Sequence, residues 1–321
     1  MKSRGLGDVY KRQGLSLPLG HELETEPAGT IRCRFWGYGS DGTVGANKNS
    51  IKIIGDNTDM YAQGYFQYDS KKSGGITISH LRFGREEIQS QYLLSHVDFV
   101  ALHKASYIGR YDILGGIKEG GTLLLNSDWE SGEVFENLTE DLQRTIIDKK
   151  IKVFNINALK ISESVGLGAR LSTVMQAAFF KISGVLPEAE ALKLIKDAIK
   201  KTFISKGEAI VQMNWDAVDK ASAALEEVPI PEAITKSAPI PQLIPDSAET
   251  FAREVIEPIM HFKGDDISVS QMPYDGFIPT GTTRLEKRGV APHVPRWIPE
   301  NCIQCNQCSL VCPHATIRAK Q

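Results

Sequence analysis

Short apolar runs alternate with longer amphipathic stretches over the first two thirds of the chain. The apolar runs, several of them rich in β-branched residues, predict strands over 31–36, 65–68, 76–84, 98–104, 121–126 and 152–157. The amphipathic stretches predict helices over 48–61, 170–183, 187–202 and 208–227. The polar Thr77 and Ser79 alternate with apolar residues, which predicts that the strand at 76–84 is half-exposed. Strands and helices in this order predict an α/β fold with a mostly parallel sheet and flanking helices.

Proline changes the pattern after residue 228. Five prolines fall within about twenty residues, at positions 229, 231, 239, 241 and 245. This density predicts an extended linker. A short irregular module punctuated by glycine and proline follows it, and a cysteine-rich segment ends the chain. No apolar run reaches the ~18 residues that a membrane helix requires, so we expect no membrane span.

Composition and charge exclude several classes of partner. The 321 residues include 37 Lys and Arg against 39 Asp and Glu, so the formal net charge is −2. A nearly neutral chain has no general attraction for nucleic acid or for an anionic membrane. We find no secretory signal, and we expect a cytoplasmic protein. Residues 5–13, GLGDVYKRQ, look like a translated sequencing adaptor, so we expect 1–13 to be a non-native extension.

Four of the five cysteines form one motif near the end of the chain. Cys302, Cys305, Cys308 and Cys312 are spaced C-x2-C-x2-C-x3-C and are followed by Pro313. This is the spacing of a bacterial ferredoxin cluster. Thiolates are the soft ligands that iron–sulfur clusters require, whereas structural zinc sites usually pair two C-x2-C units across a longer gap. We therefore predict that all four cysteines ligate 4Fe–4S clusters.

The motif also predicts a second cysteine run, which this chain lacks. In two-cluster ferredoxins the fourth cysteine of such a run ligates the other cluster. Cys33 lies in a predicted buried strand and is expected to be a core residue rather than the missing ligand. We expect this chain to be a fragment that holds half of a two-cluster site, and to form only labile clusters alone.

A glycine loop connects the first predicted strand to the first predicted helix. Gly37 to Gly45 contains G-x-G-x-x-G, whose bare backbone amides can approach a phosphate at a helix N-terminus. The alternative is a tight turn that needs glycine only for packing. A dinucleotide site would place an acid after the second strand, where Asp69 lies, but Lys71 and Lys72 follow it. The lysine pair favours a nucleotide with an additional phosphate, such as coenzyme A, over NAD.

Together these motifs resemble the central portion of the pyruvate:ferredoxin (flavodoxin) oxidoreductases. The resemblance rests on GYGSDGTVGANKNSIKIIGDNTD (37–59), AQGYFQYDSKKSGGITISHLRFG (62–84), GLGARLSTVMQAAFF (166–180), LEKRG (285–289) and the cysteine run. It implies a γ-type, coenzyme A-binding domain at 28–230 and a proline-rich linker at 231–249. It further implies a module named for its Glu-Lys-Arg tripeptide at 250–292, and the start of a 4Fe–4S ferredoxin-type domain at 293–321.

The resemblance also implies a function. The family decarboxylates pyruvate oxidatively on thiamine diphosphate, forms acetyl-CoA and CO2, and passes electrons through 4Fe–4S clusters to ferredoxin or flavodoxin. The thiamine diphosphate domains lie outside this chain, so they are expected as partners, no catalytic residue is assigned, and the complete enzyme is expected to be a homodimer. The resemblance assigns coenzyme A binding to Gly39, Ser40, Asp41, Gly42, Thr43, Lys71, Ser172 and Asn214.

Two further functions stay open at this point. The chain could be a separate electron-transfer subunit of a 2-oxoacid:ferredoxin oxidoreductase, which binds thiamine-carrying chains. Alternatively, it could be a simple NAD(P)-binding module with a zinc-bound tail. Metal and sulfide analysis would distinguish the two alternatives, because zinc without sulfide would favour the zinc-bound tail over an iron–sulfur cluster.

Overall fold

The structure is a computed structural model that describes residues 25–69, 75–234, 236–285, 295–313 and 315–319. The chain divides into two compact units, Met1–Lys287 and Arg288–Gln321, which are described separately here.

A seven-stranded sheet forms the centre of the first unit. Its strands are β1 (Ile31–Tyr38), β2 (Tyr61–Tyr68), β3 (Ile76–Gly84), β4 (Val97–Leu102), β5 (Ile117–Asn126), β6 (Lys152–Ile156) and β7 (Glu226–Glu227), in the spatial order β2-β3-β1-β4-β5-β6-β7. The strands β1, β4, β5 and β6 are parallel neighbours. β3 is antiparallel to both β1 and β2, so β2 runs in the same direction as β1. Among the described strands only β3 and β7 run the other way, which confirms the predicted α/β fold with a mostly parallel sheet.

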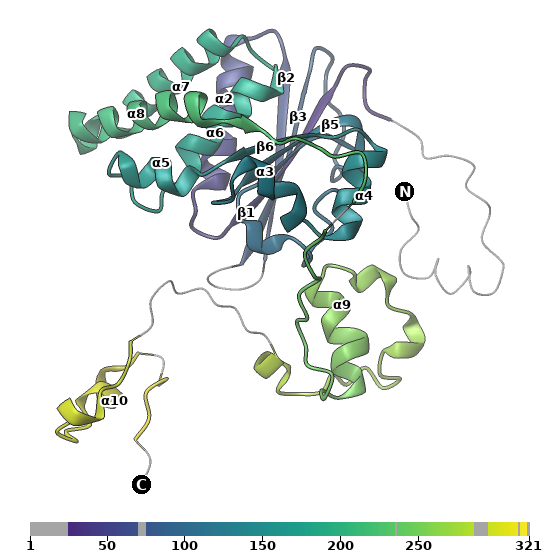
Figure 1. The fold of residues 1–321 in the computed structure, drawn as a ribbon, viewed down its shortest axis with the longest axis vertical. Helices are drawn as coiled ribbons and strands as arrows, with labels where there is room; N and C mark the ends of the chain where they lie inside the picture. Colours follow the sequence, from purple (N-terminus) through teal and green to yellow (C-terminus); the bar gives the residue numbers. More distant parts are fainter. Residues whose placement is uncertain (1–24, 70–74, 235, 286–294, 314, 320–321) are drawn as a thin grey trace. The chain divides into compact units, whose positions relative to one another are not determined.

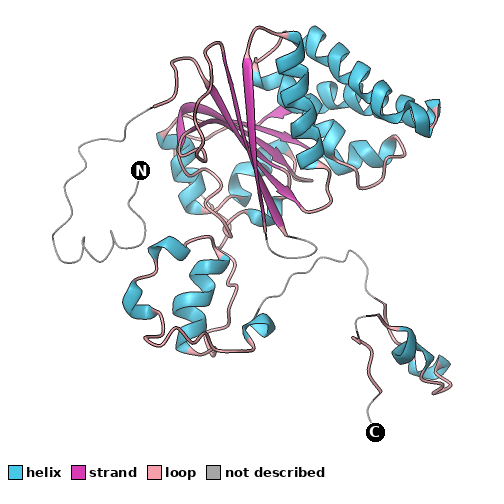
Figure 2. Ribbon diagram, turned by 180° about the vertical axis from the view of Figure 1, so that it is seen from behind, coloured by secondary structure: helices cyan, strands magenta, loops and turns pink. Residues whose placement is uncertain are grey.

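Helices cover both faces of the sheet, as Figures 1 and 2 show. One face carries α2 (Thr43–Asn57), α5 (Ala158–Ser164), α6 (Ser172–Ser183), α7 (Glu188–Phe203) and α8 (Glu208–Ala224), and the other carries α3 (Ser131–Val134) and α4 (Glu140–Asp148). Successive strand residues point to opposite faces. In β5, Leu124 therefore packs under α6, whereas Leu123 and Leu125 join the core beneath α4.

Several details differ from the sequence predictions. β2 and β5 begin four residues earlier than predicted, and α4, α5 and β7 were not predicted. The helix expected at 48–61 begins earlier, at Thr43, directly after the glycine loop, and it ends at Asn57. The prediction that β3 is half-exposed was wrong, because Thr77 is only 6% exposed and Ser79 is fully buried. β3 lies inside the sheet and packs against α2, so polar residues at alternate positions do not indicate solvent here.

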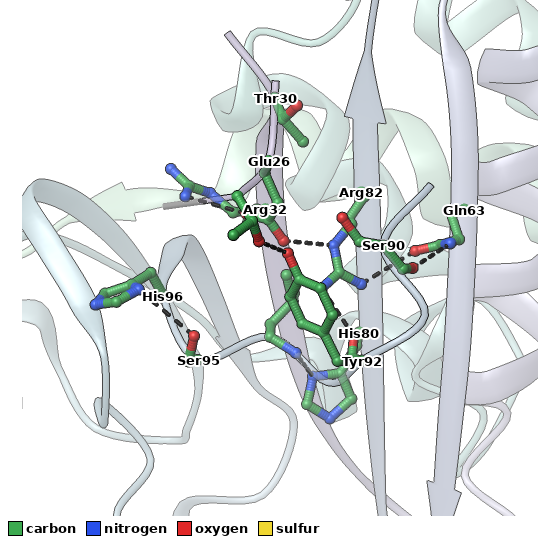
Figure 3. Close-up of polar contacts among 12 residues, drawn as sticks. Glu26, Thr30, Arg32, Gln63, His80, Arg82, Ser90, Tyr92, Ser95 and His96 are labelled. Carbon is green, nitrogen blue, oxygen red and sulfur yellow. Dashed lines mark hydrogen bonds and ion pairs between the residues drawn. The ribbon is translucent and has the colours of Figure 1, made fainter. Parts of the chain in front are cut away.

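A buried polar network lies where β1 and β3 are neighbours (Figure 3). Glu26 accepts hydrogen bonds from two arginines, Arg32 on β1 and Arg82 on β3. Arg82 also donates to the side chain of Gln63 on β2 at 3.0 Å, and Arg32 pairs with Asp98 on β4 at 3.0 Å. The network thus connects four strands and the segment that precedes β1.

Short helical turns dominate the rest of the first unit. A π-helical turn at Ala252–Ile256 leads into α9 (Glu257–Met260). The ring of Phe262 packs against that of Tyr111 in a tilted arrangement, with ring centroids 5.0 Å apart. The second unit contains a 3-10 turn at Pro299–Asn301 and α10 (Gln307–Val311). None of the helices that the structure describes could span a bilayer, because each is too short or too polar.

Candidate functional site

A cavity of about 490 Å³ opens at the carboxyl ends of the parallel strands. Tyr38 reaches it from the end of β1, Lys104 from the residues after β4, Asn126 from the end of β5, and Asn157 from the residue after β6. Open α/β sheets bind their ligands in the crevice at this edge. The cavity is therefore the first candidate for a ligand site in this unit.

The glycine loop forms one wall of the cavity through Ser40 and Asp41. The Asp41 carboxylate accepts hydrogen bonds from the amide of Tyr38 at 2.8 Å and from the amide of Thr43 at 2.7 Å. Ser40 and Gly42 adopt left-handed backbone conformations, with φ of 79° and 86°. Asp41 thus stabilises the turn and caps the first amide of α2. The next amides of the first helical turn have no intrahelical partner, so they can donate to a ligand.

Close packing explains two of the loop glycines. A Cβ on Gly37 would lie 2.7 Å from the Thr43 side chain, and a Cβ on Gly42 would lie 2.7 Å from Oγ of Ser172. Gly45, in contrast, has open space around it. Gly37 and Gly42 are therefore explained by close packing, the alternative to phosphate binding. The same packing places Ser172, at the start of α6, against the start of α2.

A buried hydrogen bond fixes the start of α2 to the residue that follows β4. Oγ1 of Thr43 lies 2.7 Å from Nδ1 of His103, and both side chains are buried. Burial lowers the pKa of His103, which the nearby Asp41 carboxylate only partly offsets, so the ring is neutral. A neutral ring has one acceptor nitrogen, so Nδ1 can accept a hydrogen bond from the Thr43 hydroxyl group.

Lys104 is a site residue that the sequence analysis missed. Its Nζ lies 4.1 Å from the ring centroid of Tyr38, and both residues line the cavity. Burial and the charge of Arg110 lower the pKa of Lys104, while Asp41 raises it. Its position at the end of a predicted strand, 98–104, is the signal that could have identified it.

The remaining predicted coenzyme ligands do not all come together. Asn214 is 4% exposed, accepts a hydrogen bond from Oγ1 of Thr173 at 3.0 Å, and donates to the carbonyl of Ile210 at 2.8 Å. Both polar atoms of its amide are thus used within the helical layer. Gly39 donates its amide to the carbonyl of Gly75. Lys71 lies outside the described residues.

The strand order bears on the NAD(P) alternative. A dinucleotide fold places its ribose-binding acid after a strand that runs parallel beside β1. Here the neighbours of β1 are β3 and β4, and β2, which precedes Asp69, is separated from β1 by the antiparallel β3. This topology argues against a dinucleotide site of that kind.

The cysteine run forms a loop suited to sulfur ligation. Gln304 and Asn306 have left-handed φ values of 56° and 59°, so the chain reverses between successive cysteines. Hydrogen bonds from the Gln304 amide and the Trp297 indole lower the pKa of Cys302, and the Thr316 amide donates to Sγ of Cys312 at 3.3 Å. Such N–H donors to sulfur are a feature that tunes iron–sulfur centres.

The donor set fits a 4Fe–4S cluster by chemistry and spacing. Cys302, Cys305 and Cys308 are exposed and Cys312 is half-buried. Within the described residues, no three potential metal ligands already form a cage. Cys33 is buried in β1, and burial raises the pKa of its thiol, which confirms that it is a core residue.

Comparisons with known proteins divide the chain into three matches. Residues 32–224 match the family described as "Pyruvate ferredoxin/flavodoxin oxidoreductase", residues 237–291 match the EKR "Domain of unknown function", and residues 295–318 match the "4Fe-4S binding domain".

Curated relatives match nearly the whole chain. It is 55% identical to the pyruvate:ferredoxin oxidoreductase of Moorella thermoacetica, over 94% of this chain and 26% of that protein. It is 49% identical to a putative pyruvate-flavodoxin oxidoreductase of Synechocystis, over 93% of this chain and 25% of that protein. The chain thus spans about a quarter of the length of these relatives. Among solved structures, the pyruvate oxidoreductase subunit PORC of Thermotoga maritima matches with 18% identity and a TM-score of 0.49, over 61% of this chain and 97% of that one.

The first of the three family matches covers more than half of the chain, and the curated relatives share its name. The chain belongs to the pyruvate ferredoxin/flavodoxin oxidoreductase family.

Proposed function

We propose that this chain supplies coenzyme A binding and part of the electron path of an oxidoreductase that converts pyruvate to acetyl-CoA and CO2. The electrons leave through 4Fe–4S clusters to ferredoxin or flavodoxin. One observation carries the proposal: a single polypeptide joins a cavity at the carboxyl edge of an α/β sheet to a ferredoxin-type cysteine run.

The cavity is the proposed coenzyme A site. Loop residues 39–43 bring the start of α2 to its rim, Ser172 lies directly against Gly42, and Lys104 adds an ammonium group. Helix N-termini and ammonium groups both favour phosphate. Lys71 and Asn214 remain predicted ligands, and the inward hydrogen bonds of Asn214 support a role in fixing α8 to α6.

The cysteine run is the proposed start of the electron path. Cys302, Cys305 and Cys308 would hold one cluster together with a ligand from outside this chain, and Cys312 would serve the second cluster. Each cluster supplies one-electron chemistry when it is bound. The amide and indole donors around Cys302 stabilise its thiolate form, which is the form that binds iron.

Thiamine diphosphate is assigned to domains outside this chain. The coenzyme supplies the carbanion stabilisation that cleavage of pyruvate requires, and none of the described residues is proposed to act on that bond. In the relatives, this section is embedded in a protein about four times as long. That arrangement supports an intramolecular partner over a separate electron-transfer subunit. The complete enzyme is proposed to be a homodimer.

A direct test titrates the full chain with coenzyme A and, in parallel, with NADP+ and NAD+ by calorimetry. The proposal expects stoichiometric binding of coenzyme A and none of either dinucleotide. A second measurement determines iron, zinc and acid-labile sulfide after anaerobic reconstitution. Binding of a dinucleotide without coenzyme A, or zinc without sulfide, would favour the NAD(P)-module alternative instead.

A further inference from the structure

Lys104 presents an ammonium group that forms no ion pair within 4.0 Å among the described residues. Its Nζ faces the ring of Tyr38, and the nearby Asp41 carboxylate acts on it only through its charge, which raises its pKa. The side chain is about half-buried in the cavity wall, and burial lowers the pKa of its amine. A partly desolvated ammonium group that contacts a ring rather than a carboxylate can pair with an anion that enters the cavity.

The backbone around Lys104 is fixed before any ligand binds. The amide of His103 donates to the carbonyl of Trp36 at 2.9 Å, and the carbonyl of His103 accepts a hydrogen bond from Asn126 at 2.9 Å. The carbonyl of Lys104 accepts the Tyr107 amide at 3.1 Å. Ligand binding therefore needs to order only the lysine side chain, which keeps the entropic cost small.

The carboxylates that line the cavity would repel a phosphate, so phosphate binding there requires a cation. Asp41 places a carboxylate at the start of α2, where it offsets the positive end of the helix dipole. The described residues that line the cavity include a second carboxylate, Asp128, and a neutral histidine, His103. Lys104 supplies the cationic group among them, so a phosphate that enters the cavity has one ammonium group to pair with.

We propose that Lys104 binds a phosphate group of the nucleotide ligand and sets the cavity's preference for phosphate-bearing ligands. This inference rests on the proposed coenzyme A site and adds to it a residue outside the loop. Coenzyme A carries phosphate in two places, the diphosphate and the 3′-phosphate of the ribose. The experiment separates them with 3′-dephospho-coenzyme A.

The test measures the Kd of both ligands by calorimetry on the full chain and three variants. Lys104→Met removes the charge, Lys104→Arg keeps it, and Lys152→Met is the matched control. Lys152 is exposed at the amino end of β6, the opposite edge of the sheet from the cavity. Removing a charge-assisted hydrogen bond costs ~1.5–3 kcal/mol, so K104M is expected to weaken coenzyme A binding about 10- to 100-fold. K104R is expected to restore most of the affinity, and K152M is expected to bind like the wild type.

Each outcome decides the inference. Equal losses for both ligands in K104M support contact with the diphosphate, and a loss for coenzyme A alone supports contact with the 3′-phosphate. Wild-type affinity in K104M, or equal losses in K104M and K152M, would overturn the role of Lys104 but leave the coenzyme A site standing. If the wild-type chain itself does not bind coenzyme A, the proposed function fails first, and the inference fails with it.

Discussion

Glu26 holds Arg82 in the interior of the sheet: its Oε1 lies 2.6 Å from Nε of an arginine that is only 1% exposed. The other oxygen of Glu26 lies 3.2 Å from Nη1 of Arg32, so one carboxylate serves two guanidinium groups. Buried charges require paired partners, because an unpaired ion loses its hydration without compensation. The segment before β1 is therefore part of the fold, although its sequence shows no regular pattern.

We expect Glu26→Ala to destabilise the first unit by about 3–5 kcal/mol, the usual cost of removing one partner from a buried ion pair. The matched control is Glu119→Ala, which removes an ion pair to Lys150 whose side chains are 69% and 78% exposed. Exposed pairs of this kind contribute less than about 1 kcal/mol. Urea denaturation followed by circular dichroism measures both, and similar losses in the two variants would contradict the structural role of Glu26.

His80 gives the stability of the fold a dependence on pH. It accepts the Leu94 amide at Nδ1 and pairs through Nε2 with Gln67, while burial, Arg34 and Arg82 lower its pKa to about 3. An unfolded histidine has a pKa of about 6.5. Between these values the unfolded chain binds a proton that the folded chain does not, so stability falls as the pH falls below about 6.5. Above that pH, this group adds no pH dependence.

The corresponding measurement is the free energy of unfolding between pH 7 and pH 4 in the wild type and in His80→Gln. A single histidine contributes a slope of up to about 1.4 kcal/mol per pH unit in this range. Glutamine keeps a donor and an acceptor but does not titrate, so the variant is expected to show a shallower slope. His103, whose pKa burial also lowers, retains its own contribution in the variant. An unchanged slope in His80→Gln would show that His80 is not neutral in the folded chain.

The sequence predicted six of the seven described strands, because most of them are apolar runs that end at a polar or glycine position. It placed the starts of β2 and β5 four residues late and missed the two-residue β7. It did not reveal that β3 inserts between β2 and β1, since strand order depends on pairings between distant segments. The same insertion explains why Thr77 and Ser79 are buried despite their polarity. The local pattern of apolar and polar residues thus identifies a strand such as β3. Packing between distant segments decides which of its faces are buried.

The candidate site shows a similar division. The glycine loop was identified from residue types, because turn geometry at Gly42 is encoded locally by its left-handed φ of 86°. Lys104 was missed because its one signal, a position at the end of the predicted strand 98–104, does not show which other residues lie beside it. It joins the loop only when β1 and β4 pair in parallel and bring Tyr38 and Lys104 to the same edge.

Gly42→Ala tests whether the loop geometry matters for binding. Alanine in a left-handed conformation costs about 1–2 kcal/mol, and its Cβ would lie 2.7 Å from Oγ of Ser172. We expect lower stability and weaker coenzyme A binding, because the loop must shift away from the start of α6. Gly45→Ala is the control: its Cβ meets open space inside α2, where alanine is favoured by roughly 0.5–1 kcal/mol. Equal coenzyme A affinity in both variants would show that the loop geometry does not contribute to the site.

The cysteines allow a test with an internal control. Cys308→Ser removes a proposed cluster ligand from the exposed loop, whereas Cys33→Ala removes a buried core thiol. After anaerobic reconstitution, we expect the wild-type chain to hold labile clusters in less than stoichiometric amounts, because the spacing leaves ligands to be supplied from elsewhere. Cys308→Ser is expected to lose most of the bound iron and sulfide, and Cys33→Ala is expected to keep the wild-type amount. If both variants lost iron equally, the bound metal would depend on global folding rather than on the run from Cys302 to Cys312. Two intact 4Fe–4S clusters per chain by Mössbauer spectroscopy would instead show that this polypeptide contains every ligand it needs.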